Sequence, residues 1–437
     1  MKATLGVVIS LACLGTLATA AAAQDQVTFA KDVAPILQEH CQVCHHPNTV
    51  APMSLMTYQD ARPWAKAIKA KVAAREMPPW FIDKNIGVQH FDNDTSLSDQ
   101  EIATLVKWAD GGALEGNPAD IPSPRQFPDE QTWQIGKPDV IVSLPKDLIM
   151  KAQGPDWWPD ITIDPHLTEN RYIQAIQIIP VKGYENIHHI RTSMVKPGDD
   201  SIHGGAVDGN VELEMVQQGV FLDEYAIGKG ADIFKNGAGR YITAGTKINF
   251  EFHIHASGKE SPVNVLLGLK FYPKDYNPQH IVTSMTIGSN VVDLRPHEAD
   301  VRSDGYLPLV KDTRLLSWQP HMHLRGKAEC LEAIFPTGKT QMISCARFEF
   351  NWMDNYVYAD DQAPLLPAGT ILHTLMWHDN SDAMRSNPDP DAQIVGGLRT
   401  VDEMSSAWVS YYYMSGDDFK KETEARKAQH ETLTSQR

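Results

Sequence analysis

Two histidines one residue apart, His321 and His323 in Trp318-Gln-Pro-His-Met-His, are the strongest candidates for chemistry in this chain. Side chains alternate between the faces of an extended strand, so both imidazoles lie on one face and can reach one metal ion. Further potential ligands are His188, His189, His253 and Met404. A thioether among imidazoles is a donor set typical of copper. The sequence therefore predicts copper as the metal.

The histidines outside the His321 and His323 pair need interpretation. Adjacent His188 and His189 point to opposite faces of a regular strand, so they can bind one ion only where the strand is twisted or bulged. His253 and His255 share a face, and the sequence alone allows either of them to be the ligand. We expect His378 to orient neighbouring groups or to pack at a strand end.

A second motif, Cys41-Gln-Val-Cys44-His45, predicts covalent attachment of haem c. The two cysteines supply the thioether bonds, and the histidine supplies one axial ligand of the iron. A redox dithiol or half of a zinc site is the alternative interpretation. For the other axial ligand we favour Met77, in Arg-Glu-Met-Pro-Pro-Trp, because it follows a predicted helix on a loop stiffened by prolines. Its rivals are Met53 and Met56.

Composition limits the classes of protein to consider. With 437 residues, the chain is long enough for about three domains. Its 42% apolar and 22% charged residues are typical of a folded protein. The net charge of −16 argues against nucleic acid or an anionic membrane surface as a partner.

Residues 1–23 resemble a secretory signal peptide, with Lys2 as the only charge, an apolar stretch, and alanines before Gln24. No later segment has the roughly 20 apolar residues that a spanning helix needs. We therefore expect an exported mature protein, periplasmic or secreted, without a membrane span. Cys13 would leave with the signal. Cys330 and Cys345 flank a predicted hairpin turn and should form a disulfide there.

The pattern of elements changes along the chain. Residues 24–116 show helical periodicity over 30–38, 62–74 and 98–110, and residues 117–135 are rich in turn-forming residues and predict a linker. Short β-type segments follow, with a spacing that suits antiparallel sandwiches. We place a first sandwich at 136–276, a second at 277–416, and a charged helical tail at 417–437. The strands are expected at 140–143, 161–163, 172–179, 187–194, 247–254, 264–272, 281–287, 314–322, 328–335, 341–350, 370–379 and 408–414.

Three short helices that carry a CxxCH motif resemble a small cytochrome c domain. The later motifs resemble the copper type II, ascorbate-dependent monooxygenases, and in particular bacterial forms fused to a haem domain. The shared segments are Ile187-His-His-Ile, Phe252-His, Pro320-His-Met-His-Leu-Arg-Gly, Phe350-Asn-Trp, His378-Asp-Asn-Ser and Asp402-Glu-Met. The resemblance extends over nearly the whole mature chain.

The resemblance implies a small all-α cytochrome c domain followed by two all-β, jelly-roll-like sandwiches, which face each other across a solvent-filled cleft. Each sandwich would hold one copper ion. His188, His189 and His253 would bind the copper that stores electrons, which is why we prefer His253 to His255. His321, His323 and Met404 would bind the catalytic copper.

The implied activity is hydroxylation of a C–H bond of a small organic substrate by O2. The haem, held by Cys41, Cys44, His45 and Met77, would pass on electrons from a periplasmic donor such as a reduced cytochrome, a cupredoxin or a small reductant. The alternative function is a non-enzymatic haem and copper protein for electron transfer or copper binding.

Overall fold

The computed structural model describes residues 26–47, 51–125, 133–196, 220–226, 229–289, 291–397 and 399–435. The predicted signal peptide, with Cys13, lies outside these residues. The protein is mostly β, with several antiparallel sheets and a few N-terminal helices. It divides into two compact units: a helical unit (26–47, 53–78 and 97–125 of the described residues) and a β unit that contains the other described residues.

The helical unit forms around a small apolar core that includes Phe29, Leu37 and Trp108. A capping box begins its longest helix, because Glu101 N donates to Ser98 Oγ while Ser98 N donates to the Glu101 carboxylate. The helices are η1 (Phe29–Val33), α1 (Ala34–Ile36), η2 (Leu37–Cys41), α2 (Tyr58–Ala61), η3 (Arg62–Trp64), α3 (Ala65–Ala73), α4 (Asp99–Asp110) and η4 (Pro118–Asp120). The helices predicted near 30–38, 62–74 and 98–110 are confirmed.

We call the strands before residue 275 the first β lobe. They are β1 (Val140–Ser143), β2 (Leu148–Met150), β3 (Asp160–Ile163), β4 (Arg171–Lys182), β5 (Ile187–Val195), β6 (Val220–Ala226), β7 (Asp232–Ile233), β8 (Ala238–Ile242), β9 (Lys247–Ile254) and β10 (Ser261–Phe271), with η5 (Tyr184–Asn186) before β5. The four-stranded sheet β3-β9-β5-β6 and the strands β1, β10 and β4 contribute to one apolar core.

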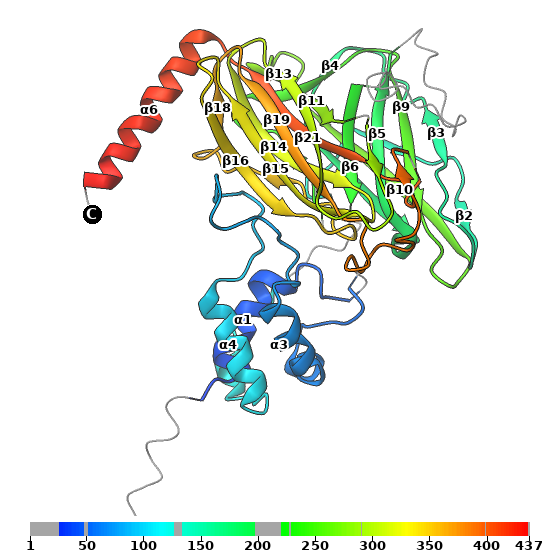
Figure 1. The fold of residues 1–437 in the computed structure, drawn as a ribbon, viewed down its shortest axis with the longest axis vertical. Coiled ribbons are helices and arrows are strands. Elements are labelled where there is room, and N and C mark those ends of the chain that lie inside the picture. The colour runs from blue at the N-terminus through cyan, green and yellow to red at the C-terminus, as the bar shows by residue number, and fades with distance from the viewer. Residues whose placement is uncertain are drawn as a thin grey trace, which may run out of the picture. The chain divides into compact units, whose positions relative to one another are not determined.

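We call the later strands the second β lobe. They are β11 (His280–Gly288), β12 (Asp293–Leu294), β13 (Val301–Pro308), β14 (Thr313–Met322), β15 (Gly326–Ile334), β16 (Thr340–Arg347), β17 (Tyr356–Val357), β18 (Leu365–Leu366), β19 (Ile371–His378), β20 (Ile394–Val395) and β21 (Ser405–Tyr413). The sheet β13-β19-β15-β16 shares a second core with β11, β14 and β21. Figure 1 shows the layered strands of the two lobes.

The two lobes are joined by a continuous sheet. β8 of the first lobe pairs in parallel with β11 of the second, which gives the order β1-β10-β4-β8-β11-β21-β14-β17. Ala238, Val282, Tyr412 and Met414 form a small buried cluster at this joint. The sequence predicts two consecutive sandwiches, and it does not anticipate that they share a sheet within one compact unit.

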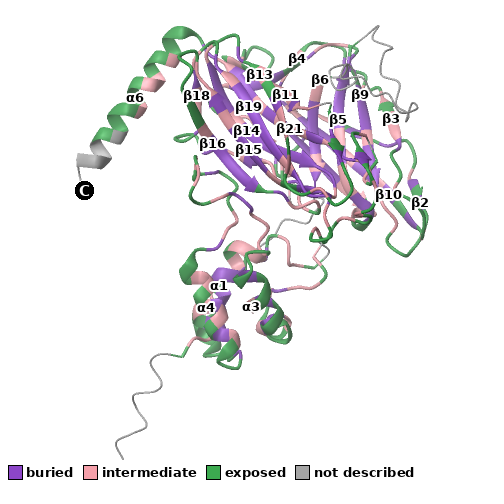
Figure 2. Cartoon of the chain, viewed as in Figure 1, coloured by how far each residue is buried: buried purple, intermediate pink, exposed green. Residues whose placement is uncertain are grey.

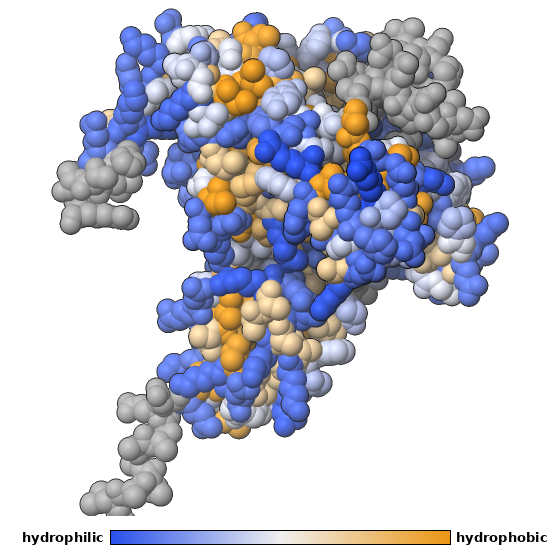
Figure 3. Space-filling view, in the orientation of Figure 1, coloured by the Kyte–Doolittle hydropathy of each residue, from blue (hydrophilic) through white to orange (hydrophobic). Residues whose placement is uncertain are grey.

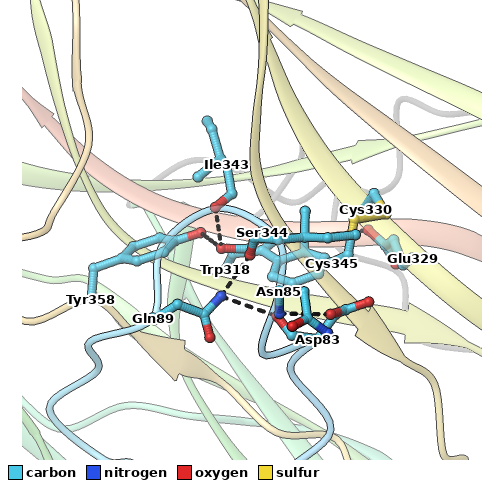
Figure 4. The surroundings of a disulfide bond; sticks show 11 residues. Asp83, Asn85, Gln89, Trp318, Glu329, Cys330, Ile343, Ser344, Cys345 and Tyr358 are labelled. Carbon is cyan, nitrogen blue, oxygen red and sulfur yellow. Dashed lines mark hydrogen bonds between the residues drawn. A yellow bond between two sulfur atoms is a disulfide. The ribbon is translucent and has the colours of Figure 1, made fainter.

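Residues 79–96 leave the helical unit and pack on the second lobe, although the sequence places them within the haem domain. We call this segment the arm. Asp83 N donates to Cys345 O, and Val88 N donates to Ile343 O, so the arm extends the edge of β16. Its Trp80 ring lies 5.0 Å from that of Tyr356. Figure 4 shows Asp83 and other arm residues beside the disulfide.

The predicted disulfide is present. Cys330 on β15 lies directly opposite Cys345 on β16, and the two residues are bonded. The turn between these strands contains Gly338, whose φ of 81° is in the region that favours glycine. The disulfide therefore links β15 to β16, the strand with which the arm pairs.

The predicted C-terminal helix is also confirmed, as α6 (Gly416–Ser435). Most of its described side chains are exposed, and its surface is hydrophilic, whereas the strands of both lobes are largely buried (Figures 2 and 3). Arg314 of β14 pairs with Glu422 of the helix. No helix in the described part of the chain combines the length and apolar character needed to cross a bilayer.

All twelve predicted strands correspond to observed strands, but two longer strands were not predicted. β6 contains Asp223 and Glu224, which interrupt its apolar pattern, yet both side chains are buried. Lys229 forms an ion pair with Asp223, with Nζ of the lysine 2.5 Å from Oδ1 of the aspartate. β13 contains Gly305 and ends in Pro308, residues that are unfavourable in strands, and it is an edge strand of its sheet.

Candidate metal centre

The first set of histidines comes from two neighbouring strands. His189 on β5 lies opposite His253 on β9, and the ladder between these strands is irregular between Ile187 and His189. This irregularity allows His188 and His189 to approach the same point. Nitrogen atoms of His188, His189 and His253 lie within 4.8 Å of one another. The structure therefore brings all three predicted ligands together.

The nitrogen atoms of this set suit a metal ion. His188 Nε2 and His189 Nδ1 are buried, and neither has a hydrogen-bond partner among the described residues. His253 Nε2 lies 2.9 Å from Oδ2 of Asp156. Because an ionised carboxylate can only accept, this contact assigns the proton to Nε2 and leaves Nδ1 of His253 as the electron-pair donor. Three imidazole nitrogens are thus available, as a metal requires.

Burial keeps two of these imidazoles, those of His188 and His189, neutral. Burial, with a smaller contribution from the neighbouring His253, lowers the pKa of His188 to about 3. Burial also places the pKa of His189 well below its ordinary value. The hydrogen bond from His253 holds the pKa of Asp156 below the usual range. Metal binding requires neutral imidazole, so neither His188 nor His189 has to lose a proton at neutral pH before it can bind.

The second set lies in the second lobe, at the ends of β14 and β21. These strands pair so that His321 is opposite Ser406 and Met322 is opposite Ser405. The pairing brings the residues just beyond the strands, His323 and Met404, to the same edge. His321 Nε2 lies 3.2 Å from Met404 Sδ, and the rings of His321 and His323 are 5.6 Å apart. Two imidazoles and a thioether therefore meet in one place.

Burial determines the ionisation of this set as well. It lowers the pKa of His323 to about 4 and that of His321 well below its ordinary value. His323 Nδ1 lies 3.3 Å from Asp402 O, an oxygen that can only accept a hydrogen bond. His323 Nε2 is consequently free of the proton and able to bind a metal.

Glu403 connects the two loops that carry the second set. It is fully buried, and its carboxylate accepts hydrogen bonds from the backbone N–H groups of His323, Arg325 and Met404. The Arg325 guanidinium donates to Asn380 Oδ1 and to Val401 O. These contacts hold the loop that carries His323 against the loop that carries Met404.

The other two histidines considered above have different surroundings. His255 is outside the histidine cluster; its backbone N–H donates to Asn186 O, and its side chain is half-buried. His378 is fully buried on β19, and its Nε2 lies 3.0 Å from the backbone oxygen of Met404. His378 therefore contacts the backbone of the loop that carries Met404.

The haem motif adopts a helical turn in the helical unit. Both Cys44 N and His45 N donate to Cys41 O, and His45 Nδ1 lies 3.1 Å from Met53 O. That contact orients the imidazole and leaves Nε2 available for iron. Burial raises the pKa of the Cys41 thiol to about 12, which is unfavourable for a redox dithiol. These features fit the attachment of haem c.

The methionines proposed for the other axial position differ in their surroundings. Met53 packs against the core of the helical unit, and its backbone oxygen receives the His45 contact. Met77 is half-buried and stands just before the point where the chain enters the arm. Met56 is also half-buried. The two axial ligands of a haem lie on opposite faces of the ring, and these surroundings do not distinguish between the three sulfur atoms, so Met77 stays a prediction.

Several residues that contact the ligands were not predicted from the sequence. Asp156 stands in Gly-Pro-Asp-Trp-Trp-Pro, and an acidic residue beside two tryptophans in a loop was its only signal. Glu403 could have been noticed as an acidic residue next to a methionine ligand. Thr400 gave no signal, and the segment Phe350-Asn-Trp gave no indication that its ring contacts His188, because these contacts depend on how the two lobes pack.

Comparisons with known proteins do not assign the chain to a family. No family model matches it, and no curated protein does. Among solved structures, the major capsid protein P2 from Bacteriophage PM2 aligns over 63% of this chain and 98% of its own, with 10% identity and a TM-score of 0.27. The infectious bursal disease virus VP2 subviral particle aligns over 64% and 73%, with 7% identity and a TM-score of 0.21. At these scores the likeness indicates neither a fold family nor a function.

Proposed function

We propose that this chain is an exported, copper-dependent monooxygenase with a haem c unit, similar to the copper type II, ascorbate-dependent enzymes. Each β lobe would act as a sandwich domain that contributes one metal site. The single observation that carries this proposal is the pair of ligand sets that the fold gathers, one of three imidazoles and one of two imidazoles and a thioether. A methionine sulfur among histidines is a donor set that favours copper.

Copper bound at the two sites would supply electrons and an O2-binding position for a reaction in which RH, O2, two electrons and two protons give ROH and H2O. The residues of the chain set the conditions for that reaction. Burial keeps the imidazoles of His188, His189, His321 and His323 neutral. Asp156 and Glu403 fix the orientation of the first and second sets, respectively. These contacts limit the reorganisation that each site needs on a change of oxidation state.

The helical unit would hold the haem through Cys41, Cys44 and His45, with Met77 as the proposed second axial ligand. A haem with histidine and methionine ligands has a raised reduction potential, which suits a relay to copper. We propose that this unit receives electrons from a periplasmic donor and passes them to the β unit. Export is consistent with the signal-like N-terminus and with the disulfide between Cys330 and Cys345.

The first experiment measures copper and iron in the haem-loaded protein after copper loading and desalting, and then O2 uptake with a panel of small organic substrates. We expect two coppers per iron and O2 uptake that requires a substrate. The variant His323→Ala should lose one copper and the uptake, whereas His255→Ala should keep both. Two coppers without uptake across the panel would favour the electron-transfer alternative, and fewer than two would contradict the proposal.

A further inference from the structure

The arm begins with a tryptophan that packs into the second lobe. Trp80 is the third residue after Met77, the proposed axial ligand, and the two residues between them are both proline. Proline fixes its own φ angle, so this connection is stiff. Trp80 packs against the core of the second lobe, where its ring lies 5.0 Å from that of Tyr356. The side chain nearest in sequence to the proposed haem ligand on its C-terminal side is thus part of the lobe that carries the second ligand set.

A second tryptophan extends this contact to the strand that carries His321. Tyr356 on β17 is the cross-strand partner of Trp318 on β14, and the centroids of their rings are 5.7 Å apart. Both rings lie in the core, since Trp318 is fully buried and Tyr356 is 2% exposed. β14 then continues from Trp318 through two residues to His321. Three aromatic rings and one strand therefore connect the arm with a ligand of the second set.

The backbone of the arm has its own attachment to the second lobe. Arg347 N, at the end of β16, donates to Phe81 O at 3.0 Å, and Asp92 N donates to Val357 O of β17 at 2.8 Å. These bonds add to those that the arm makes with the middle of β16. They begin at the residue directly after Trp80, so they hold its backbone in place and do not require its ring. A substitution of the ring can therefore test its role while the arm stays attached.

From these contacts we propose that Trp80, Tyr356 and Trp318 form the route by which an electron passes from the helical unit to the second ligand set. This inference rests on the proposed function, because it assumes haem c with Met77 as a ligand and copper at the second set. The step transfers one electron: ferrous haem is oxidised to ferric haem, and copper(II) of the second set is reduced to copper(I). Electronic coupling falls less steeply through bonded or packed atoms than across a gap, and a protein core is close-packed.

The test is flash photoreduction of the haem in the fully copper(II)-loaded protein without O2, with the haem absorbance recorded afterwards. We expect the haem to be reoxidised at a rate that does not depend on protein concentration. His323→Ala should remove the second copper and abolish this phase, whereas His188→Ala should remove the first copper and keep the phase. Loss of the phase in His188→Ala would overturn the inference and leave the proposed function intact. A haem that stays reduced beside two bound coppers would instead contradict the relay in the proposed function.

Two variants test the rings themselves. Trp80→Leu and Tyr356→Leu should each slow reoxidation of the haem several-fold, while the copper content and the haem reduction potential stay at the wild-type values. Tyr356→Phe keeps the ring and should keep the rate.

Phe91→Leu is the matched control, because its buried ring packs beside the route, 5.5 Å from the ring of Trp80 and 5.3 Å from that of Tyr358. It should keep the wild-type rate. Wild-type rates in both Trp80→Leu and Tyr356→Leu would show that the electron does not use these rings. An equal slowing in Phe91→Leu would attribute the effect to general loss of packing and would also contradict the inference.

Discussion

Replacement of Glu403 by glutamine should separate the two loops of the second ligand set. One oxygen of the carboxylate accepts from His323 N and Met404 N, and the other accepts from Arg325 N at 2.9 Å. A glutamine side chain can keep its oxygen at the first position, but its NH2 group then faces the Arg325 N–H. This buried N–H loses its acceptor, because two donors cannot pair.

The expected cost follows from that single lost contact. A buried N–H without a partner destabilises the protein by about 1–3 kcal/mol. Burial raises the pKa of Glu403 to about 7, so the native carboxylate is itself costly to keep ionised, and its removal offsets part of the loss. We therefore expect the free energy of unfolding to fall by about 1–2 kcal/mol. Copper affinity of the second set should fall by about 10-fold to 100-fold, as for other groups that orient ligands.

The assay is urea denaturation followed by tryptophan fluorescence, together with copper titration of the metal-free protein. Glu424→Gln is the matched control, because it removes the same charge from an exposed position on α6. It should leave both measurements unchanged. A Glu403→Gln protein with the stability and copper affinity of the wild type would show that the carboxylate does not hold the loops together.

Two further predictions concern stability. Replacing both Cys330 and Cys345 by alanine removes a bond between residues with a sequence separation of 15. The unfolded chain then gains freedom, and the free energy of unfolding should fall by about 3 kcal/mol. Equal denaturation midpoints for the variant and the non-reduced wild type would contradict this. Burial raises the pKa of Asp354 from 3.8 to about 7, so the folded protein retains a proton that the unfolded chain has lost, and stability falls as pH rises between these values. Asp354→Asn should therefore be more stable than the wild type at pH 8, by at most about 4 kcal/mol, and the difference should vanish near pH 4; a difference that does not depend on pH would refute the assignment.

Much of the fold could be predicted because it depends on local patterns. Short β-type segments identified β5, β9 and β14, and helical periodicity over 98–110 identified α4. β6 could not be found in this way, because its buried Asp223 is compatible with a strand only when Lys229 pairs with it. A pairing of that kind is formed by the folded chain and has no periodic signal.

The sequence by itself determined the candidate ligands and their chemistry, since imidazole and thioether donors are properties of residue types. It also determined the disulfide, because a hairpin places Cys330 opposite Cys345. Tertiary structure decided what surrounds the ligands. The bulge in β5 gathers the first set, and the joined sheet brings His189 within 6.1 Å of His321. The first contact joins His189 to His253, 64 positions away, and the second joins His189 to His321, 132 positions away. Only the packing of the folded chain can specify contacts over such separations.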